Sequence, residues 1–243
     1  MRQRMATNAV FITATGTGVG KTVVSSLLLG FLRKQGIKAG YQKWVSTGGE
    51  MPEDLLYCLQ KNDMEFDHGK LDSQVVYRFL MAASPHLAAQ NEGREVDPER
   101  IKEAFARSAK ENDVLVVEGV GGVLVPLRSD LLLADFLAGL QLPALIVAHS
   151  GLGTINHTLL TIEALRQREL PLLGVVFSDE KEGMAADDPL VADNMRTIAD
   201  MAGVEVFGRL SRLGDYGQLE RDFQPVGYAI WQRFRLLTEA RKR

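Results

Sequence analysis

The stretch that decides the fold is "ATGTGVGKT", Ala14–Thr22. It looks like a phosphate-binding loop, although the standard pattern G-x-x-x-x-G-K-[ST] requires a glycine five places before Gly20, where this sequence has Thr15. The run "AVFIT" (9–13) precedes the loop and is typical of a buried strand, and an apolar helical stripe begins at Thr22. Strand, glycine loop and helix in this order predict backbone N–H groups that wrap a phosphate at a helix N-terminus.

The polar residues of the loop predict its chemistry. We expect Lys21 to reach the terminal phosphates of a nucleoside triphosphate and the Thr22 hydroxyl to lie on Mg²⁺. The alternative, a glycine-rich turn with a coincidental G-K-T, does not account for the strand and the helix on either side. The residues that we expect to bind nucleotide are Thr15, Gly16, Thr17, Gly18, Val19, Gly20, Lys21 and Thr22.

Short β-branched runs recur along the chain, and most are followed by a helical pattern. Runs such as "VLVVE" and "ALIVA" are apolar without alternation, as in strands that are buried on both faces. We therefore predict an α/β fold of the P-loop NTPase type, one domain over residues 1–243, with a mostly parallel sheet and helices on both faces. The expected strands are 9–13, 39–45, 113–119, 144–149, 172–177 and 204–208, and the expected helices are 22–35, one from Pro52, one from Asp97, 131–140, 155–168, 188–202 and one from about Gly227.

Composition excludes several classes of protein. The chain has 243 residues, of which 46% are apolar and 24% charged, with a formal net charge of −3, so nothing indicates a nucleic-acid or membrane surface. The longest apolar region, "LLLADFLAGLQLPALIVAHS", is interrupted by Asp135, Gln141 and Pro143 and is expected to be a helix followed by a strand. The single cysteine, Cys58, cannot form an internal disulfide, which favours a cytoplasmic protein.

Three features outside the loop point to the same edge of the sheet. Glu118 ends the strand "DVLVVEG", where α/β sheets bind ligands, and it could hold Mg²⁺; by itself it could equally be a solvated strand-end acid. Lys43, at the end of the second strand, would be another cation there, or else an ordinary surface lysine. "SGLGTINHT" (150–158) is a second strand-to-helix turn that could receive an anion, or be a tight turn capped by Thr154.

Taken together, these motifs resemble the dethiobiotin synthetase family. The segments "TGTGVGKT", "KWVSTG", "SPH", "EGVGG", "AD" and "GLGTINHTLLT" occur in the family's order and approximate spacing, between about Ala9 and Phe177. The family's loop reads G-T-x-T-x-x-G-K-T, which is one residue longer than the standard frame. Thr15 and Thr17 fit it and Gly16 is incidental, whereas Ala14 replaces the first glycine and requires a backbone there without positive φ.

The resemblance implies a carboxylating ligase. One amine of 7,8-diaminopelargonate captures CO₂ as a carbamate, ATP phosphorylates the carbamate, and the second amine closes the ring and releases phosphate. The resemblance implies catalytic roles for Lys21, Lys43 and Thr17, and Mg²⁺ held by Thr22, Asp54 and Glu118; Asp54 alone would read as an acid at a helix N-terminus. It further implies a homodimer, Ser178 beside the base, and substrate contacts at Thr47, Gly121, Gly153, Thr154, Ile155 and Asn156.

Departures from the family concern the nucleotide base. Ser178 stands where the family has an asparagine that reads adenine, and one hydroxyl cannot make a paired amide contact. The segment "FGRLSRL" (207–213) also lacks the family's proline, and Trp44 replaces a proline next to Lys43. The enzyme is therefore expected either to accept ATP and other nucleoside triphosphates or to act on a different amine.

Other P-loop proteins are the alternatives. A partition-type ATPase would need a signature lysine at Gly16, and an amide synthetase with a glutaminase domain would need a longer chain with a nucleophilic cysteine. A ligase for another amine or carboxylate, and a non-catalytic regulatory P-loop domain, stay open. The C-terminal "WQRFRLLTEARKR" reads as an amphipathic helix with a basic end that suits the helix dipole.

Overall fold

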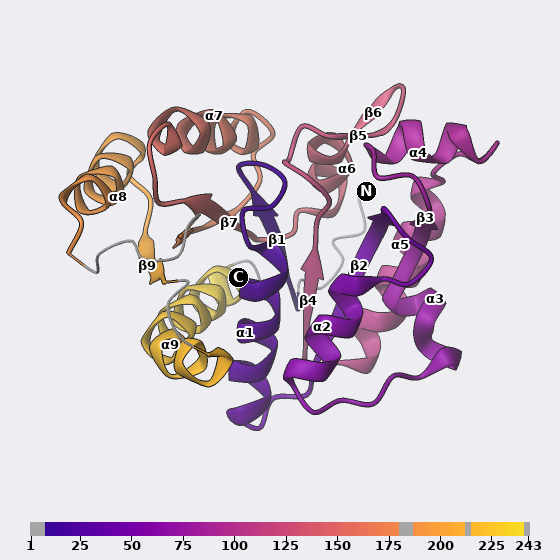
Figure 1. The fold of residues 1–243 in the computed structure, drawn as a ribbon, viewed down its shortest axis with the longest axis horizontal. Helices are drawn as coiled ribbons and strands as arrows, with labels where there is room; N and C mark the ends of the chain where they lie inside the picture. The colour runs from indigo at the N-terminus through magenta and orange to yellow at the C-terminus, as the bar shows by residue number, and fades with distance from the viewer. Residues whose placement is uncertain (1–7, 180–186, 212–214, 241–243) are drawn as a thin grey trace.

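A computed structural model describes residues 8–179, 187–211 and 215–240. A seven-stranded sheet in the order β3-β2-β4-β1-β7-β8-β9 runs through the molecule, and its neighbouring strands pair in parallel (Figure 1). The strands are β1 (Ala9–Ala14), β2 (Ala39–Thr47), β3 (Val75–Phe79), β4 (Val114–Glu118), β7 (Ala144–His149), β8 (Leu172–Ser178) and β9 (Val206–Leu210), and a small hairpin joins β5 (Pro126–Arg128) and β6 (Leu131–Leu132).

Helices cover both faces of this sheet. One apolar core lies between the sheet and α1, α2 and α9, and the other lies between the sheet and α4 to α8 (Figure 1). The sequence of β1 does not alternate between apolar and polar residues, because both faces of the strand are buried. Phe11 packs into one core, and Val10 and Ile12 pack into the other. The α/β prediction is confirmed. The helices are α1 (Lys21–Lys34), α2 (Glu53–Lys61), α3 (Leu71–Gln74), α4 (Pro85–Asn91), α5 (Pro98–Glu111), α6 (Leu133–Leu140), α7 (Thr154–Arg166), α8 (Pro189–Ala202) and α9 (Tyr216–Ala240), with a 3₁₀ turn at His68–Lys70.

Two expectations about elements need correction. The last helix begins at Tyr216 and not near Gly227, and it contains Pro225. A proline normally marks a helix boundary, but Phe223 and Val226 on either side of it are buried in the core, and this packing carries the helix through. The strand β3 was not expected, because the run "VVYRF" is short and its apolar pattern is broken by Arg78.

The parallel strands bring their carboxyl ends to one edge of the sheet. The glycine loop leaves β1 between β4 and β7, the Thr15 N–H donates to Val147 O at 3.1 Å, and the Gly119 N–H after β4 donates to Ile12 O at 2.9 Å. This edge is where α/β sheets bind ligands. Among the described helices, none has the combination of length and apolar character that crossing a membrane requires.

Candidate nucleotide and metal site

The glycine loop has the backbone that its unusual frame requires. Gly18 and Gly20 have positive φ angles of 77° and 108°, whereas Ala14 is the last residue of β1 and is absent from the non-glycine residues with positive φ. Gly16 has no positive φ, and a Cβ there would meet only Val19 Cγ2 at 3.9 Å. Alanine at position 14 is therefore tolerated, and the glycine at 16 is conformationally dispensable, as expected.

The start of α1 is open to an anion. The helix begins at Lys21 after Gly20, no side chain caps it, and its first turn contains no acidic residue. The unpaired N–H groups of a first helical turn and the helix dipole favour a phosphate in this position. Lys21 Nζ donates to Gly16 O at 3.2 Å, so the ammonium folds back over the loop that would surround the phosphate.

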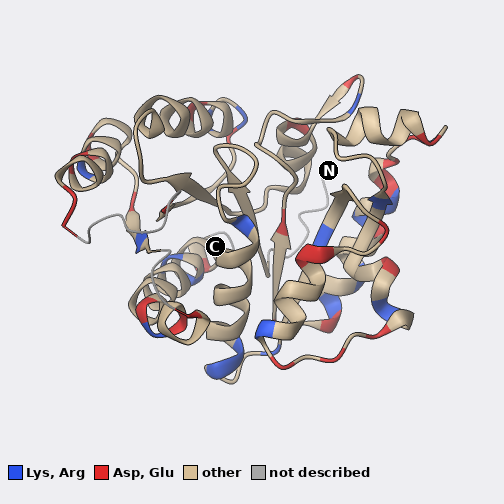
Figure 2. Cartoon of the chain, viewed as in Figure 1, with Lys and Arg blue, Asp and Glu red and all other residues tan. Residues whose placement is uncertain are grey.

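Four of the predicted residues form one polar cluster. Lys43 Nζ donates to Glu118 Oε1 at 2.8 Å and also to Asp54 Oδ2. Thr22 Oγ1 lies 2.6 Å from Asp54 Oδ1 and 3.0 Å from Glu118 Oε1. Figure 2 shows the charges that meet here, with basic residues at the start of α1 and in the middle of β2, and acidic residues at the end of β4 and the start of α2. The sequence placed Lys43 at the end of its strand, but β2 continues to Thr47, and Lys43 pairs with the last residue of β4.

Burial sets the electrostatics of the cluster. The side chains of Glu118 and Lys43 are 0% and 7% exposed, and that of Asp54 is 32% exposed. Burial acts to lower the pKa of Lys43, but attraction by Glu118 and Asp54 outweighs it, and the pKa of Lys43 is raised. For Asp54, burial acts to raise the pKa and attraction by Lys43 outweighs it, so that the pKa is lowered. Burial lowers the pKa of Lys21, which Glu118 only partly offsets.

The donor set fits Mg²⁺ better than a transition metal. The Thr22 hydroxyl lies within hydrogen-bond distance of one oxygen of Asp54 and one of Glu118, and hard oxygen ligands are those that Mg²⁺ prefers. In the described part of the chain, no group of three or more His, Cys, Asp and Glu side chains could hold a metal. A cation bound by two carboxylates and one hydroxyl needs phosphate oxygens and water to complete its shell, which is typical of Mg²⁺ in nucleotide sites.

Ser178 lies against the phosphate loop. It ends β8, it is buried, and its Oγ is 2.8 Å from where a Cβ on Gly20 would be. The Ser150 N–H donates to Ser178 O at 3.2 Å, which ties the end of β8 to the turn after β7. Residues 212 and 213 of the "FGRLSRL" segment and the basic end of the C-terminal helix, 241–243, lie outside the described residues.

The residues expected to bind substrate fall into two groups. Thr47 ends β2, and Gly121 follows β4 with a φ of 58°, where a Cβ would lie 3.7 Å from Thr17 Oγ1. The second group begins α7: Gly153 precedes the helix with a φ of 88°, Thr154 turns inward to Thr158 at 3.3 Å, and Asn156 is exposed. Three strand-to-strand steps separate β2 from β7, about 14 Å at the usual spacing, so Thr47 and the start of α7 are not neighbours within one chain.

Two polar contacts of this edge were missed from the sequence. Tyr41 OH donates to Glu118 Oε2 at 3.0 Å; because alternate residues of a strand share a face, the spacing from Tyr41 to Lys43 was a usable signal. Asp179 accepts from Arg209 at 2.7 and 2.9 Å and from Ser150 Oγ at 2.6 Å. That network joins the ends of β7, β8 and β9, and no sequence signal reveals it before the strand order is known.

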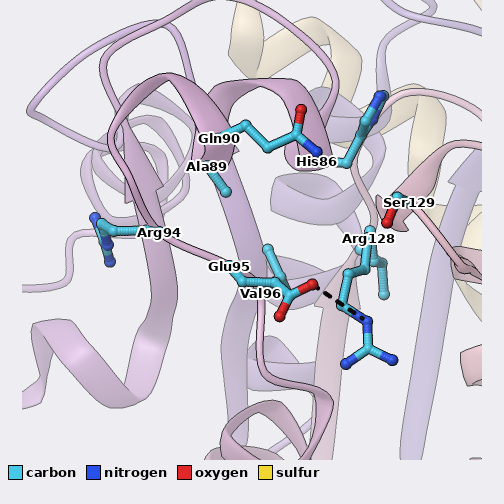
Figure 3. Close-up of a pocket in the computed structure, with 9 residues that line it drawn as sticks. His86, Ala89, Gln90, Arg94, Glu95, Val96, Arg128 and Ser129 are labelled. Carbon is cyan, nitrogen blue, oxygen red and sulfur yellow. Dashed lines mark ion pairs between the residues drawn. The ribbon is translucent and has the colours of Figure 1, made fainter.

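A shallow cavity between α4 and the β5–β6 hairpin is lined by none of the predicted site residues (Figure 3). Glu95 Oε1 lies 3.7 Å from Arg128 Nε across it, and Arg128 is held by Asp130 at 2.6 and 3.0 Å. His86 Nδ1 lies 3.0 Å from Ser84 Oγ. Arg94, which also lines the cavity, pairs with Glu92 at 3.1 Å, so the charged groups here belong to a network of surface ion pairs.

The fold and the loop define the class: a parallel sheet whose first strand enters a glycine loop, with Lys21 and Thr22 opening the next helix, is a P-loop nucleotide-binding protein. Solved structures agree with this fold. A chain of the MinC:MinD cell division protein complex of Aquifex aeolicus is 17% identical, with a TM-score of 0.56 over 96% of both chains. The pNOB8 ParA structure, bound to nonspecific DNA, is 13% identical, with a TM-score of 0.58 over 94% of this chain and 99% of that one.

Sequence relatives give the family. The AAA domain family matches residues 8–219. The ATP-dependent dethiobiotin synthetase BioD of Brachyspira hyodysenteriae is 38% identical over 82% of this chain and 90% of its own length. The enzyme of the same name from Methanocaldococcus jannaschii is 37% identical over 89% and 99%. The chain belongs to the dethiobiotin synthetase family of ligases, which confirms the resemblance found in its motifs.

Proposed function

We propose that the chain catalyses the ATP-dependent formation of dethiobiotin from 7,8-diaminopelargonate and CO₂. The observation that carries the proposal is the cluster at the phosphate loop, in which Lys43 and Thr22 each contact both Asp54 and Glu118. Two lysines, Lys21 and Lys43, are buried beside the loop, and a regulatory domain without catalytic activity would not require them. Membership in a family of ligases supports the same function.

The carbamate, ATP and the released phosphate are all negatively charged and would be bound at this cluster. One amine adds to CO₂ and loses a proton to give a carbamate, whose oxygen then takes the γ-phosphoryl group of ATP and releases ADP. The second amine attacks the carbonyl carbon, the C–O bond to phosphate breaks, and the ring closes. The raised pKa of Lys43 keeps its amine protonated, and we assign Lys43 and Lys21 to the charge that develops on the phosphoryl oxygens.

Thr22, Asp54 and Glu118 would hold Mg²⁺, which supplies neutralisation of the phosphate charge when it is bound. Lys43 contacts both of these carboxylates, so its ammonium lies beside the phosphoryl group that this site would receive. Thr17, close to Gly121, is assigned as a hydroxyl donor on the side of the carbamate. No protein nucleophile is required, in keeping with Cys58, whose pKa burial raises well above its ordinary value.

The base of the nucleotide would be bound near Ser178. A serine offers one hydroxyl and cannot distinguish the amino and ring-nitrogen edge of adenine as a side-chain amide does. We therefore propose that ATP, GTP and CTP support the reaction within about tenfold of one another, or roughly 1.4 kcal/mol. A strong preference for ATP alone would contradict this assignment.

The active enzyme is proposed to be a homodimer in the cytoplasm. Gly153–Asn156 at the start of α7 would bind the carboxylate of the substrate held by the partner subunit, as the resemblance implies. Leu152, in the turn before α7, is 91% exposed, and Leu160, on α7, is 57% exposed; a second copy would cover these apolar side chains. Analytical ultracentrifugation of wild type and Leu152→Asp tests this: loss of the dimer in the variant alone is expected, and a monomeric wild type contradicts it.

The test of the function is phosphate release from Mg-ATP and bicarbonate, with and without 7,8-diaminopelargonate. The proposal predicts release that depends on the diamine, with dethiobiotin as the second product. Nucleotide binding without diamine-dependent release would favour a regulatory domain. Release that depends on another amine would favour a related ligase.

A further inference from the structure

Tyr41 makes a buried contact with the strand-end acid that the reaction does not yet account for. Its hydroxyl donates to Glu118 Oε2 at 3.0 Å, and both residues are almost wholly buried. A buried carboxylate that loses a hydrogen-bond donor bears the full cost of its lost solvation. The contact therefore matters for how Glu118 is held.

The contact follows from strand register. β2 pairs in parallel with β4 so that Lys43 stands opposite Glu118 and Tyr41 opposite Val116. Tyr41 and Lys43 are two residues apart and share one face of β2, and the phenol is long enough to reach forward to the end of β4. Cys58 on α2 interacts with the same phenol, and its Sγ lies 3.8 Å from Thr22 O, so α2 covers this part of the cluster.

The two oxygens of Glu118 have different partners. Oε1 faces Thr22 Oγ1 at 3.0 Å and Lys43 Nζ at 2.8 Å, and both of these groups are assigned to the metal or the phosphates. Oε2 accepts from Tyr41, which has no such assignment. A donor on Oε2 is therefore the one contact that can persist while the partners of Oε1 engage the nucleotide.

We propose that Tyr41 is a positioning residue of the active site, whose phenol fixes Glu118 so that Oε1 points at the cation site. This inference rests on the proposed function in so far as Glu118 is a cation ligand. Hydrogen-bonding partners of metal ligands orient them, and removing one typically weakens metal binding or activity about 10–100-fold. Tyr41 would act through Glu118 and would not touch the substrates.

The test uses Tyr41→Phe, with Tyr77→Phe as the matched control. Tyr77 is also a buried phenol, on the neighbouring strand β3, and its hydroxyl accepts from the Asp97 N–H at 2.9 Å, outside the cluster. Binding of Mn²⁺ to the protein with a non-hydrolysable ATP analogue is followed by electron paramagnetic resonance. Tyr41→Phe is expected to weaken Mn²⁺ binding about 10–100-fold, and Tyr77→Phe to leave it unchanged.

A second pair of variants shows whether the effect runs through Glu118. In a Glu118→Gln background, Tyr41→Phe is expected to cause no further loss of Mn²⁺ affinity. Wild-type affinity in Tyr41→Phe, or an equal loss in both backgrounds, overturns the proposal. Tyr41→Met, whose flexible side chain can fill the space, repeats the test if the Phe variant does not fold; if neither folds, Tyr41 is a residue of the core and the proposal fails.

The two proposals fail in different ways. If wild type binds Mn²⁺ with the analogue and Tyr41→Phe weakens it, but no diamine-dependent phosphate release occurs, the positioning role stands and the ligase assignment falls. If release occurs and Tyr41→Phe leaves both release and Mn²⁺ affinity unchanged, the ligase assignment stands and the positioning role falls. Wild type that binds no Mn²⁺ refutes the cation site and the role of Tyr41 together.

Discussion

Replacing Gly20 by alanine tests the geometry of the phosphate loop. Gly20 has a φ of 108°, and an added Cβ would lie 2.8 Å from Ser178 Oγ and 3.4 Å from Ser178 Cβ. The left-handed backbone costs an L-residue about 1–2 kcal/mol, and displacing Ser178 from its rotamer adds about 1 kcal/mol. We expect Gly20→Ala to lower the free energy of unfolding by about 2–3 kcal/mol, measured by urea denaturation.

Two glycines of the same loop provide the controls. Gly18 has a φ of 77° and nothing within 4 Å of its Cβ position, so Gly18→Ala should show the backbone strain alone, about 1–2 kcal/mol. Gly16 has neither a positive φ nor a close contact, so Gly16→Ala should be neutral or slightly stabilising. The loss of unfolding free energy is expected to be largest in Gly20→Ala, smaller in Gly18→Ala and smallest in Gly16→Ala. Equal stability of Gly20→Ala and Gly16→Ala would show that Ser178 and the backbone at Gly20 impose no constraint.

The remaining predictions concern the cluster and the base. Lys21→Ala and Lys43→Ala should each lower kcat by roughly 10²-fold or more, the scale for one preorganised electrostatic group, and full activity in both would contradict their assignment. Because its pKa is lowered on folding, Asp54 stabilises the protein above its unfolded pKa of about 3.9, and this is lost as the pH falls through its folded pKa. The free energy of unfolding, measured by urea denaturation, should therefore fall more steeply in wild type than in Asp54→Asn as the pH falls below about 5. An equal fall in the two proteins would contradict the ion pair between Asp54 and Lys43. Ser178→Asn should raise the preference for ATP over GTP and CTP in steady-state kinetics, and an unchanged preference would place the base elsewhere.

Local patterns were sufficient to predict the centre of the molecule. The glycine loop, Lys43 and Glu118 could be brought together from sequence because strand ends of a parallel sheet meet at one edge, and the structure places them in contact. The role of Asp54 could be predicted only from the family resemblance, because its sequence position indicates no more than an acid at a helix N-terminus. In the structure it belongs to the same cluster. Strand periodicity also contained the position of Tyr41, two residues before Lys43.

The periphery depended on packing that no local pattern reports. The Asp179–Arg209 pair exists because β8 and β9 are neighbours, and that order is set by the whole sheet. The start of α9 was placed too late because Pro225 suggests a boundary, whereas the apolar residues around it are held in the core. Helix propensity is a weak prior, and burial of the neighbouring side chains overrides it at Pro225.

The origin of one oxygen atom in the released phosphate tests the ligase mechanism most directly. In a single turnover, enzyme with bound Mg-ATP and 7,8-diaminopelargonate is mixed with ¹⁸O-labelled CO₂ in unlabelled water and quenched before CO₂ exchanges its oxygen. A carbamate phosphorylated by ATP predicts that the phosphate released with dethiobiotin carries one ¹⁸O atom, which is the bridging oxygen of the anhydride. Unlabelled phosphate in the same turnover would show that ATP is hydrolysed by water and would contradict the ligase mechanism.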